Sequence, residues 1–313
     1  MTLACGIDVG GTKIAGGVID LEGTVVEELR VVSPATDAEA IEDAIAGLVA
    51  DLQSRHAITA VGVGAAGYID KARAVVMFAP NIAWRNVNLK AELEERIGLP
   101  VGVENDANAA AWGEFTYGAG HDVDDLLLVT VGTGVGGGVV LDGELYRGAF
   151  GVGAEIGHMR VVPDGLPCGC GNRGCFEQYA SGSALVREAR AAVRAGSLLA
   201  RDLLERAGGD PEAITGPLIT AAAQDGDTFA IEQLEVLGRW LGEGIASLTA
   251  VLDPAVVVVG GGVSEAEDLL LDPVRAAFAA QLTGRGHRPM LEIRKARLGN
   301  QAGLIGAADL ARR

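Results

Sequence analysis

The sequence has 313 residues, of which 49% are hydrophobic and 21% are charged, and it carries a net charge of −17 with a pI near 4.6. This composition is that of a globular chain with a sizeable core, and the length favours two domains because a domain typically has about 100–200 residues. The acidic balance argues against a nucleic-acid partner bound by a basic face.

The first predicted elements are two strands, 3–9 and 14–20, joined by a turn that contains Gly10 and Gly11. Asp8 already lies within the first apolar stretch, and we recognise no secretory signal, so a cytoplasmic location without a membrane partner is expected. A turn of small residues lets backbone N–H groups point at phosphate oxygens. Thr12 would add a hydroxyl and Lys13 a cation, and Asp8 could hold Mg²⁺ through water. A plain hairpin turn is the alternative interpretation.

The next predicted elements are a strand over 24–32 and a helix over 37–55, whose start contains a capping box of Thr36 with Glu39. A strand over 59–65, a helix over 88–97 and a short strand over 101–104 follow. The alternation of strands with helices argues for an α/β fold.

Polar residues end the strand 101–104 and open the next helix: Glu104, Asn105 and Asp106. A carboxylate at a helix N-terminus is held as an anion. Asp106 would therefore suit a base that accepts the proton of an attacking hydroxyl, and Asn105 could orient the same substrate. The alternative is that Asp106 only caps the helix.

A second glycine-rich hairpin has strands over 127–131 and 137–142 and a turn that includes Thr133 and Gly134. An offset of 122 positions aligns it with the first hairpin, so that Gly10 matches Gly132 and Asp20 matches Asp142. This internal repeat predicts a duplicated domain with two phosphate-facing turns, in which Thr133 would bind the terminal phosphate. Chance similarity between two glycine-rich hairpins is the alternative.

Three of the four cysteines lie within eight residues, and a histidine precedes them. Cys168, Cys170, Cys175 and His158 make a complete tetrahedral set for a structural Zn²⁺ ion. Reduced thiols without a metal are the alternative interpretation of this cluster.

Two carboxylates, Glu155 and Glu177, flank the cysteine cluster. Zinc would fix the ring of His158 and give its other nitrogen a known direction. Two acids and a fixed N–H group suit a polyhydroxylated ligand such as a sugar. Surface carboxylates beside a structural zinc are the alternative.

The remaining predicted elements are mainly helical. The helices are expected over 183–195, 198–207, 215–224, 228–252, 274–282 and 302–312, with strands over 255–259 and 291–294. The first of these strands ends at Gly260, Gly261 and Gly262, where small residues would let a nucleotide lie on the backbone.

These motifs together resemble the ROK family (repressors, open reading frames and sugar kinases), and the match spans nearly the whole chain in the expected order. The most specific parts are the Glu155–His158 segment and the Cys168–Cys175 cluster. The resemblance is greatest to the bacterial glucokinases of that family. It implies an actin-like (ribonuclease H-like) duplicated two-domain fold with an interdomain active-site cleft. We place the domains at 1–107 plus 301–313 and at 108–300, the second with the zinc-binding loop.

The resemblance also implies the activity, which is ATP-dependent phosphorylation of glucose to glucose 6-phosphate, with MgATP and structural Zn²⁺ as cofactors. Asp106 is then the base. The sugar-binding residues are Asn105, Asp106, Glu155, His158, Glu177, Asn81 and the backbone at Gly67. The nucleotide is bound at Asp8, Gly10, Gly11, Thr12, Lys13, Thr133, Gly134 and Gly261. Members are often homodimers or homotetramers.

Alternatives within the family stay open at this point. They are a kinase for another hexose or an N-acetylhexosamine, a polyphosphate-dependent glucokinase, and a non-catalytic sugar-sensing regulator. The regulators carry an N-terminal helix-turn-helix, for which a chain whose first strand starts at Leu3 is expected to leave no room.

Overall fold

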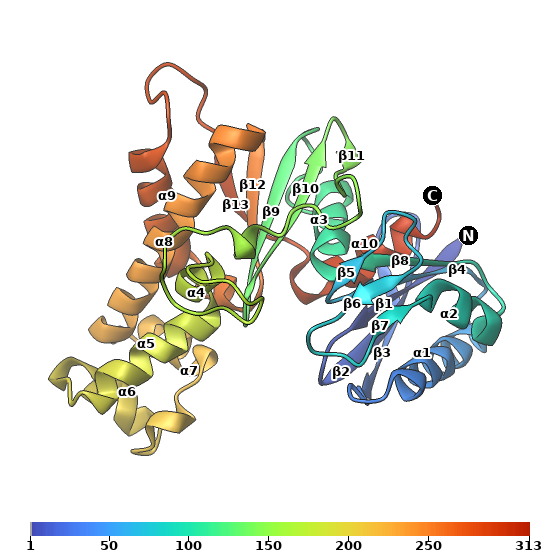
Figure 1. Cartoon of the computed structure of the whole chain (residues 1–313), viewed down its shortest axis with the longest axis horizontal. Helices are drawn as coiled ribbons and strands as arrows, with labels where there is room; N and C mark the ends of the chain where they lie inside the picture. The colour runs from blue at the N-terminus through green and yellow to red at the C-terminus, as the bar shows by residue number, and fades with distance from the viewer. Residues whose placement is uncertain (1) are drawn as a thin grey trace. The chain divides into compact units, whose positions relative to one another are not determined.

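The computed structural model describes residues 2–313, which divide into two compact units (Figure 1). Unit 1 comprises residues 2–128, 137–154 and 297–313, and unit 2 comprises residues 129–136 and 155–296. The domain boundary near residue 107 stays a prediction. Among the described residues, no helix is both long and apolar enough to cross a membrane.

Unit 1 is built on a five-stranded sheet with the order β3-β2-β1-β4-β8. Its strands are β1 Leu3–Val9, β2 Lys13–Ile19, β3 Val25–Val32, β4 Ile58–Ala65 and β8 Val101–Asn105. A small second sheet consists of β5 Tyr68–Ile69, β6 Val76–Phe78 and β7 Arg85–Val87. The helices are α1 Ala38–Gln53, α2 Leu89–Ile97, α3 Asp106–Thr116 and α10 Ala302–Leu310.

The residue alternation along β1 determines what packs on each face of this sheet. Cys5, Ile7 and Val9 are fully buried in a core shared with α1 and α2. Gly6, on the opposite face, lies against α10, since a Cβ atom there would be 1.9 Å from the carbonyl oxygen of Leu304. Large side chains therefore fill one face, and glycine admits the backbone of a helix on the other.

A second five-stranded sheet repeats the strand order of the first. Its order is β11-β10-β9-β12-β13, with β9 Leu126–Val131, β10 Val135–Leu141, β11 Glu144–Leu145, β12 Val256–Gly260 and β13 Glu292–Lys295. Each sheet has a hairpin and a third antiparallel strand on one side and two further strands on the other. The offset of 122 positions also relates the bounds of β2 to those of β10. The predicted duplication is confirmed.

The helices of unit 2 lie almost where the sequence predicts them. They are α4 Glu177–Ala180, α5 Gly182–Arg194, α6 Arg201–Arg206, α7 Gly216–Gln224, α8 Thr228–Leu252 and α9 Asp268–Gln281. Gly238 and Gly242 bring α8 close to α9, since Cβ atoms there would lie 2.6 Å from Pro273 and 2.4 Å from Val274. The two helices therefore pack nearly backbone to backbone.

Two local predictions were wrong. The N-cap of α1 is Asp37, whose side chain accepts a hydrogen bond from the N–H of Ala40, so the capping box of Thr36 with Glu39 does not form. The helix predicted from residue 274 begins at Asp268 and contains Pro273 in its second turn.

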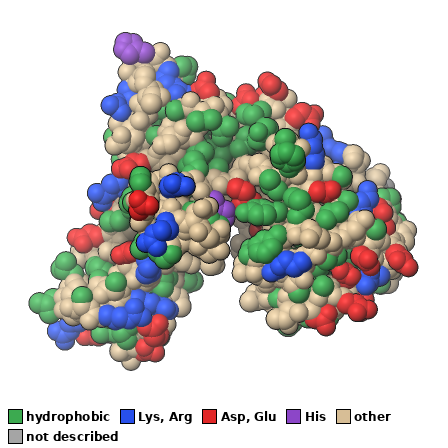
Figure 2. Space-filling view, viewed as in Figure 1, with side chains coloured by type: hydrophobic (Ala, Val, Ile, Leu, Met, Phe, Trp, Pro, Cys, Tyr) green, Lys and Arg blue, Asp and Glu red, His purple; other side chains and the backbone are tan. Residues whose placement is uncertain are grey.

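On the face shown in Figure 2, Lys and Arg side chains lie in small groups among acidic ones.

Candidate active site

Three parallel strands of unit 1, β1, β4 and β8, end side by side. Asp8, near the end of β1, pairs in register with Gly64 of β4, which in turn pairs with Glu104 of β8. The start of α3 lies beside Gly64, since a Cβ atom there would be in ordinary van der Waals contact, 3.8 Å from Cα of Asp106. Asp8 and Asp106 therefore lie at the same edge of the sheet, at the carboxyl ends of β1 and β8, with β4 between these strands.

The two carboxyl groups have unusual electrostatics. Burial raises the pKa of Asp8 to about 6; the negative charge of Asp106 acts in the same direction, and Lys13 partly offsets both. Burial also raises the pKa of Asp106, against hydrogen bonds that its carboxylate accepts from backbone N–H groups. Half-buried carboxylates without a strong cationic partner suit a hydrated Mg²⁺ ion, so the residues at this site fit that cofactor.

Asp106 is not the cap of α3. The N-cap is Asn105, whose side-chain oxygen accepts a hydrogen bond from the N–H of Asn108 at 3.0 Å. Asp106 is the first helical residue, and the N–H of Ala107 donates to its Oδ1 atom at 2.9 Å. Because Asn105 is the N-cap, the interpretation that Asp106 only caps the helix is wrong. The Oδ2 atom of Asp106 is not needed for capping.

The first phosphate-turn candidate and the loop before β7 are in contact. The N–H of Gly10 donates to the carbonyl of Lys13 at 3.0 Å, which closes the turn and leaves Thr12 and Lys13 exposed. A Cβ atom at Gly11 would be 3.5 Å from the carbonyl oxygen of Asn81. Asn81, a sugar-binding candidate, is thus positioned directly beside the turn.

The side chain of Asn105 also ties the junction of β8 and α3 to the end of β4. Its Nδ2 atom donates to the carbonyl of Gly67 at 3.1 Å. A Cβ atom at Gly67 would lie 2.5 Å from the carbonyl oxygen of Phe78, so glycine is needed where this segment meets β6. Unit 1 thereby gathers all of its sequence-predicted site residues around the ends of β1, β4 and β8.

In unit 2, Glu177 connects the second glycine-rich turn to the cysteine cluster. A Cβ atom at Gly134 would lie 2.6 Å from Oε2 of Glu177. The Oε1 atom of the same carboxylate is 3.0 Å from Sγ of Cys168 and 3.8 Å from Nδ1 of His158. Thr133 is exposed at the turn. The structure therefore brings a phosphate-turn candidate and two sugar-binding candidates together.

Glu155 and His158 stand at the two ends of one turn of 3₁₀-helix, Ile156–His158. The N–H of His158 donates to the carbonyl of Glu155 at 3.1 Å. Between them, Gly157 packs on the start of β10, where a Cβ atom would be 2.1 Å from the carbonyl oxygen of Val135. A larger residue could not be placed there without moving the backbone of either segment.

The predicted zinc ligands converge on one point. The Nδ1 atom of His158 and the Sγ atoms of Cys168, Cys170 and Cys175 all lie within 4.8 Å of one another. The separation from Cys168 to His158 is 3.7 Å and that from Cys170 to Cys175 is 3.6 Å. A tetrahedron with Zn–S bonds of about 2.3 Å has edges of about 3.8 Å, so the donor set fits zinc.

Glycines shape the loop that carries these ligands. Gly171 and Gly174 have φ angles of 91° and 77°, which side chains rarely adopt, whereas Gly169 is in open space and has no such angle. A Cβ atom at Gly174 would be 1.7 Å from the carbonyl oxygen of Val162. Two of the three glycines in the cluster are therefore required by the fold of the loop.

A cavity of about 720 Å³ lies beside the second turn, and sequence reasoning missed most of it. It is lined by Gly132, Thr133, Gly182, Ser183, Val186, Arg187, Arg190, Arg194, Ile214, Thr215, Gly216, Pro217, Thr220, Gly262 and Val263. The guanidinium groups of Arg187 and Arg190 already donate to Gln178 and Ile214. The lining thus combines a mainly apolar surface with hydroxyl groups and three arginines, a mixture that is common in small-molecule sites.

Gly261 adjoins this cavity and has a φ angle of 86°. A Cβ atom there would lie 2.5 Å from the carbonyl oxygen of Val131, the last residue of β9. The end of β12 and the end of β9 therefore touch at a position that only glycine can occupy. The three glycines at the end of the strand predicted over 255–259 pointed to Gly261 in the sequence. The rest of the cavity is formed by segments that are distant in the sequence.

Comparisons with known proteins agree over the whole chain. A profile of the ROK family matches residues 4–313. The glucokinase of Streptomyces coelicolor is 51% identical over 312 residues, covering 100% of this chain and 98% of that protein. The xylose repressor of Bacillus subtilis is 31% identical over 310 residues, covering 97% of this chain and 76% of that protein.

A solved structure is similarly close. The ROK family glucokinase from Streptomyces griseus, crystallised in complex with glucose and AMPPNP, superposes with a TM-score of 0.91 at 52% identity. The superposition covers 99% of each chain.

Proposed function

This chain belongs to the ROK family, and on that premise we propose that it transfers the γ-phosphoryl group of ATP to glucose, with Asp106 as the general base. The protein is a hexose kinase, supported by 51% identity to a curated glucokinase over its full length and by the likeness to a glucokinase bound to glucose and AMPPNP. Its two α/β units have the actin-like fold of these sugar kinases, as expected.

The proposed reaction is an in-line transfer of the γ-phosphoryl group to the terminal hydroxyl of glucose. Asp106 accepts the proton of the terminal hydroxyl while that oxygen attacks the γ-phosphorus, and the bond from the γ-phosphorus to the bridging oxygen of ADP breaks. The products are glucose 6-phosphate and ADP. Burial supports this role, because the raised pKa of Asp106 makes its carboxylate a better proton acceptor.

The sugar is held by hydrogen bonds in this proposal. Asn105 and Asn81, together with the backbone at Gly67, serve from unit 1. Glu155, Glu177 and the Nε2–H group of His158 serve from unit 2. The single observation that carries this assignment is the placement of Glu177, whose carboxylate touches both the second turn and the cysteine–histidine cluster.

The two turns and the cavity of unit 2 are proposed to bind the nucleotide. Backbone N–H groups at Gly10–Thr12 and Thr133–Gly134 would contact phosphates, with Lys13 adding a cation. Asp8 would hold the Mg²⁺ ion, which neutralises charge on the phosphates when bound. The apolar lining beside Thr133 and Gly261 accommodates an adenosine, which favours ATP over polyphosphate as the donor.

The proposal also covers zinc binding, the cellular location and the oligomeric state of the protein. His158, Cys168, Cys170 and Cys175 would hold Zn²⁺, whose role is to fix the loop that presents His158 and Glu177. Cysteines kept reduced as metal ligands suit the cytoplasm, where glucose enters glycolysis. A homodimer or homotetramer is expected, and light scattering on the purified protein would establish which.

The experiment that tests this function is a side-by-side rate measurement. Initial rates would be compared for glucose, mannose, fructose, N-acetylglucosamine and N-acetylmannosamine, with ATP and with polyphosphate as donors. We expect the highest kcat/KM for glucose with ATP. Formation of no sugar phosphate with any pair would leave a sugar-sensing regulator as the function.

A further inference from the structure

Glu104 is a buried carboxylate directly before Asn105 and Asp106, and the proposed function gives it no role. Its side chain is only 3% exposed. One oxygen, Oε1, accepts hydrogen bonds from the N–H of Asn105 at 3.2 Å and from Nδ2 of Asn108 at 3.1 Å. These bonds join the last residues of β8 to the first turn of α3, where Asp106 lies.

The second oxygen of Glu104 faces two arginines. Nε of Arg147 donates to Oε2 at 2.7 Å, and Nε of Arg73 is 3.7 Å from the same atom. Arg73 also donates to the carbonyl of Leu310 at 3.0 Å. A carboxylate this deeply buried needs such partners, because an unpaired buried charge is strongly destabilising.

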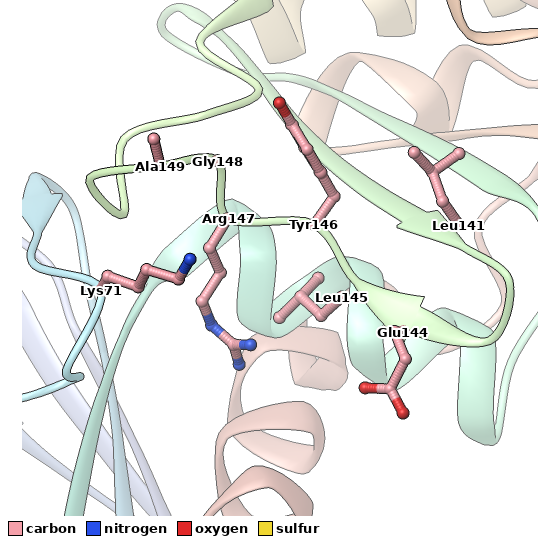
Figure 3. A pocket seen from close by; sticks show the side chains of 8 residues that line it. All are labelled: Lys71, Leu141, Glu144, Leu145, Tyr146, Arg147, Gly148 and Ala149. Carbon is pink, nitrogen blue, oxygen red and sulfur yellow. The ribbon is translucent and has the colours of Figure 1, made fainter.

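Arg147 lines a cavity of about 490 Å³ in unit 1 (Figure 3). Figure 3 shows the side chains of Arg147 and Lys71 both entering this space, Arg147 from the loop after β11. The ammonium group of Lys71 forms no hydrogen bond or ion pair with any residue that the structure describes. Lys71 therefore supplies charge to the cavity without bonding to Glu104.

Arg147 begins a closed loop that leads to the sugar-binding candidates of unit 2. The N–H of Gly153 donates to the carbonyl of Arg147 at 3.0 Å, which closes the loop 147–153. A Cβ atom at Gly151 would lie 2.4 Å from the carbonyl oxygen of Ile69, so the loop packs tightly on the end of β5. The chain passes from unit 1 to unit 2 between Ala154 and Glu155.

We propose that Glu104 is a positioning residue for the phosphoryl-transfer reaction and that Arg147 is its essential partner. Oε1 holds the junction that carries Asn105 and Asp106, while Oε2 anchors Arg147 and with it the loop that leads to Glu155. The carboxylate of Glu104 thus fixes the position of the proposed base, Asp106. It also fixes the start of the loop that leads to the sugar-binding candidate Glu155. This inference rests on the proposed function of Asp106.

Two substitutions separate this role from general packing. Glu104→Gln keeps the shape and one acceptor oxygen but removes the charge that pairs with Arg147. Arg147→Met keeps an unbranched apolar side chain, although a shorter one, and removes the guanidinium donor. In each variant we expect kcat to fall roughly ten- to a hundredfold, since small misplacements of a catalytic group have effects of this size.

Binding should be much less affected than turnover. We expect the Kd for AMPPNP, measured by calorimetry, to change by less than about threefold, because neither Glu104 nor Arg147 belongs to the two glycine-rich turns or to the lining of the cavity in unit 2. The Kd for glucose should rise, because the same junction carries Asn105 and the anchored loop leads to Glu155, but by a smaller factor than the fall in kcat. Arg147→Lys, which restores a cation, should recover part of the lost kcat.

Lys71→Met is the matched control, because it removes a cation from the same cavity that has no bond to Glu104. Its kcat should equal that of the wild type. The double variant E104Q/R147M should lose no more kcat than the worse single variant, since the two residues act as one unit.

Several results would overturn the proposal. They are a kcat within twofold of the wild type in folded Glu104→Gln or Arg147→Met, an equal loss in Lys71→Met, or additive losses in the double variant. Should Glu104→Gln fail to fold, the Arg147 variants decide. If Asp106→Ala is inactive while these variants are fully active, this inference fails and the proposed function stands; an active Asp106→Ala instead removes the proposed function.

Discussion

Asp106 lies close enough to Asp8 for its negative charge to add to the effect of burial and raise the pKa of Asp8 to about 6. Asp8 lies near the end of β1 and Asp106 directly after the end of β8, and β4 pairs with both of these strands. Two neighbouring acids repel each other unless a proton or a cation neutralises one of them, so their proximity fits the Mg²⁺ ion that we propose to accompany ATP.

The first prediction concerns the pH dependence of nucleotide binding. Protonation of Asp8 removes the charge that would hold Mg²⁺, so the affinity for Mg-AMPPNP should fall as the pH drops below about 6. In Asp106→Asn the midpoint should move to lower pH, because one cause of the raised pKa is gone. Calorimetric titrations from pH 4.5 to 8 measure this, with Asp8→Asn as the control for titration of the nucleotide itself. An identical midpoint in the wild type and in Asp106→Asn would contradict it.

A second prediction concerns stability without ligands. The native pKa of Asp8 is raised above its unfolded value of 3.8, so its ionisation destabilises the native state as the pH rises from about 4 to 6. Asp8→Asn should therefore be more stable than the wild type at pH 7.5, by about 1–3 kcal/mol, and the difference should vanish below about pH 4. Thermal unfolding across this pH range measures it. A stability difference that does not depend on pH would count against the raised pKa.

Removal of a proposed zinc ligand should cost both metal and stability. We expect Cys170→Ser to lose bound zinc and to unfold at a lower temperature, since a structural zinc site stabilises the fold that surrounds it. Elemental analysis together with thermal unfolding measures both effects. Cys5→Ala is the control, because Cys5 is buried in unit 1 outside the cluster. Wild-type protein prepared without chelators and found free of zinc would refute the structural role.

The contact of Gly134 with Glu177 gives a prediction about glucose affinity. An added Cβ atom in Gly134→Ala would lie 2.6 Å from Oε2 of Glu177, at the flexible end of a side chain that can move aside. The variant should therefore fold normally while the displaced carboxylate raises KM for glucose, roughly tenfold, which corresponds to one lost hydrogen bond to a charged group. Gly47→Ala in α1, where an added Cβ atom meets nothing within 4 Å, is the control. An unchanged KM in Gly134→Ala would mean that Glu177 does not bind the sugar.

Much of the fold could be predicted because its signals are local. The helix over 228–252 has the predicted bounds, since its apolar residues recur at helical spacing over many turns. The hairpin turns were recognisable from glycines between apolar strands. The sheet of β5, β6 and β7 was missed, because its strands are two or three residues long and too short for any periodic pattern.

The functional residues also divide into those with a local sequence signal and those without one. Asp8, Asp106 and the cysteine cluster are chemically distinctive types in short motifs, so the sequence identified them as candidates. The partnership of Glu104 with Arg147 joins residues 43 positions apart, and the cavity beside Thr133 draws on α5 and α7. No local pattern carries such relationships, because they arise only when the chain has folded.

The most direct test of the account is the turnover of Asp106→Ala with glucose and ATP. We predict a loss of kcat of at least about a thousandfold, in the range expected for removal of a general base with its positioning role, while the Kd for glucose stays within a few-fold of the wild type. Substantial turnover in a pure preparation of this variant would contradict the assignment of Asp106 as the base.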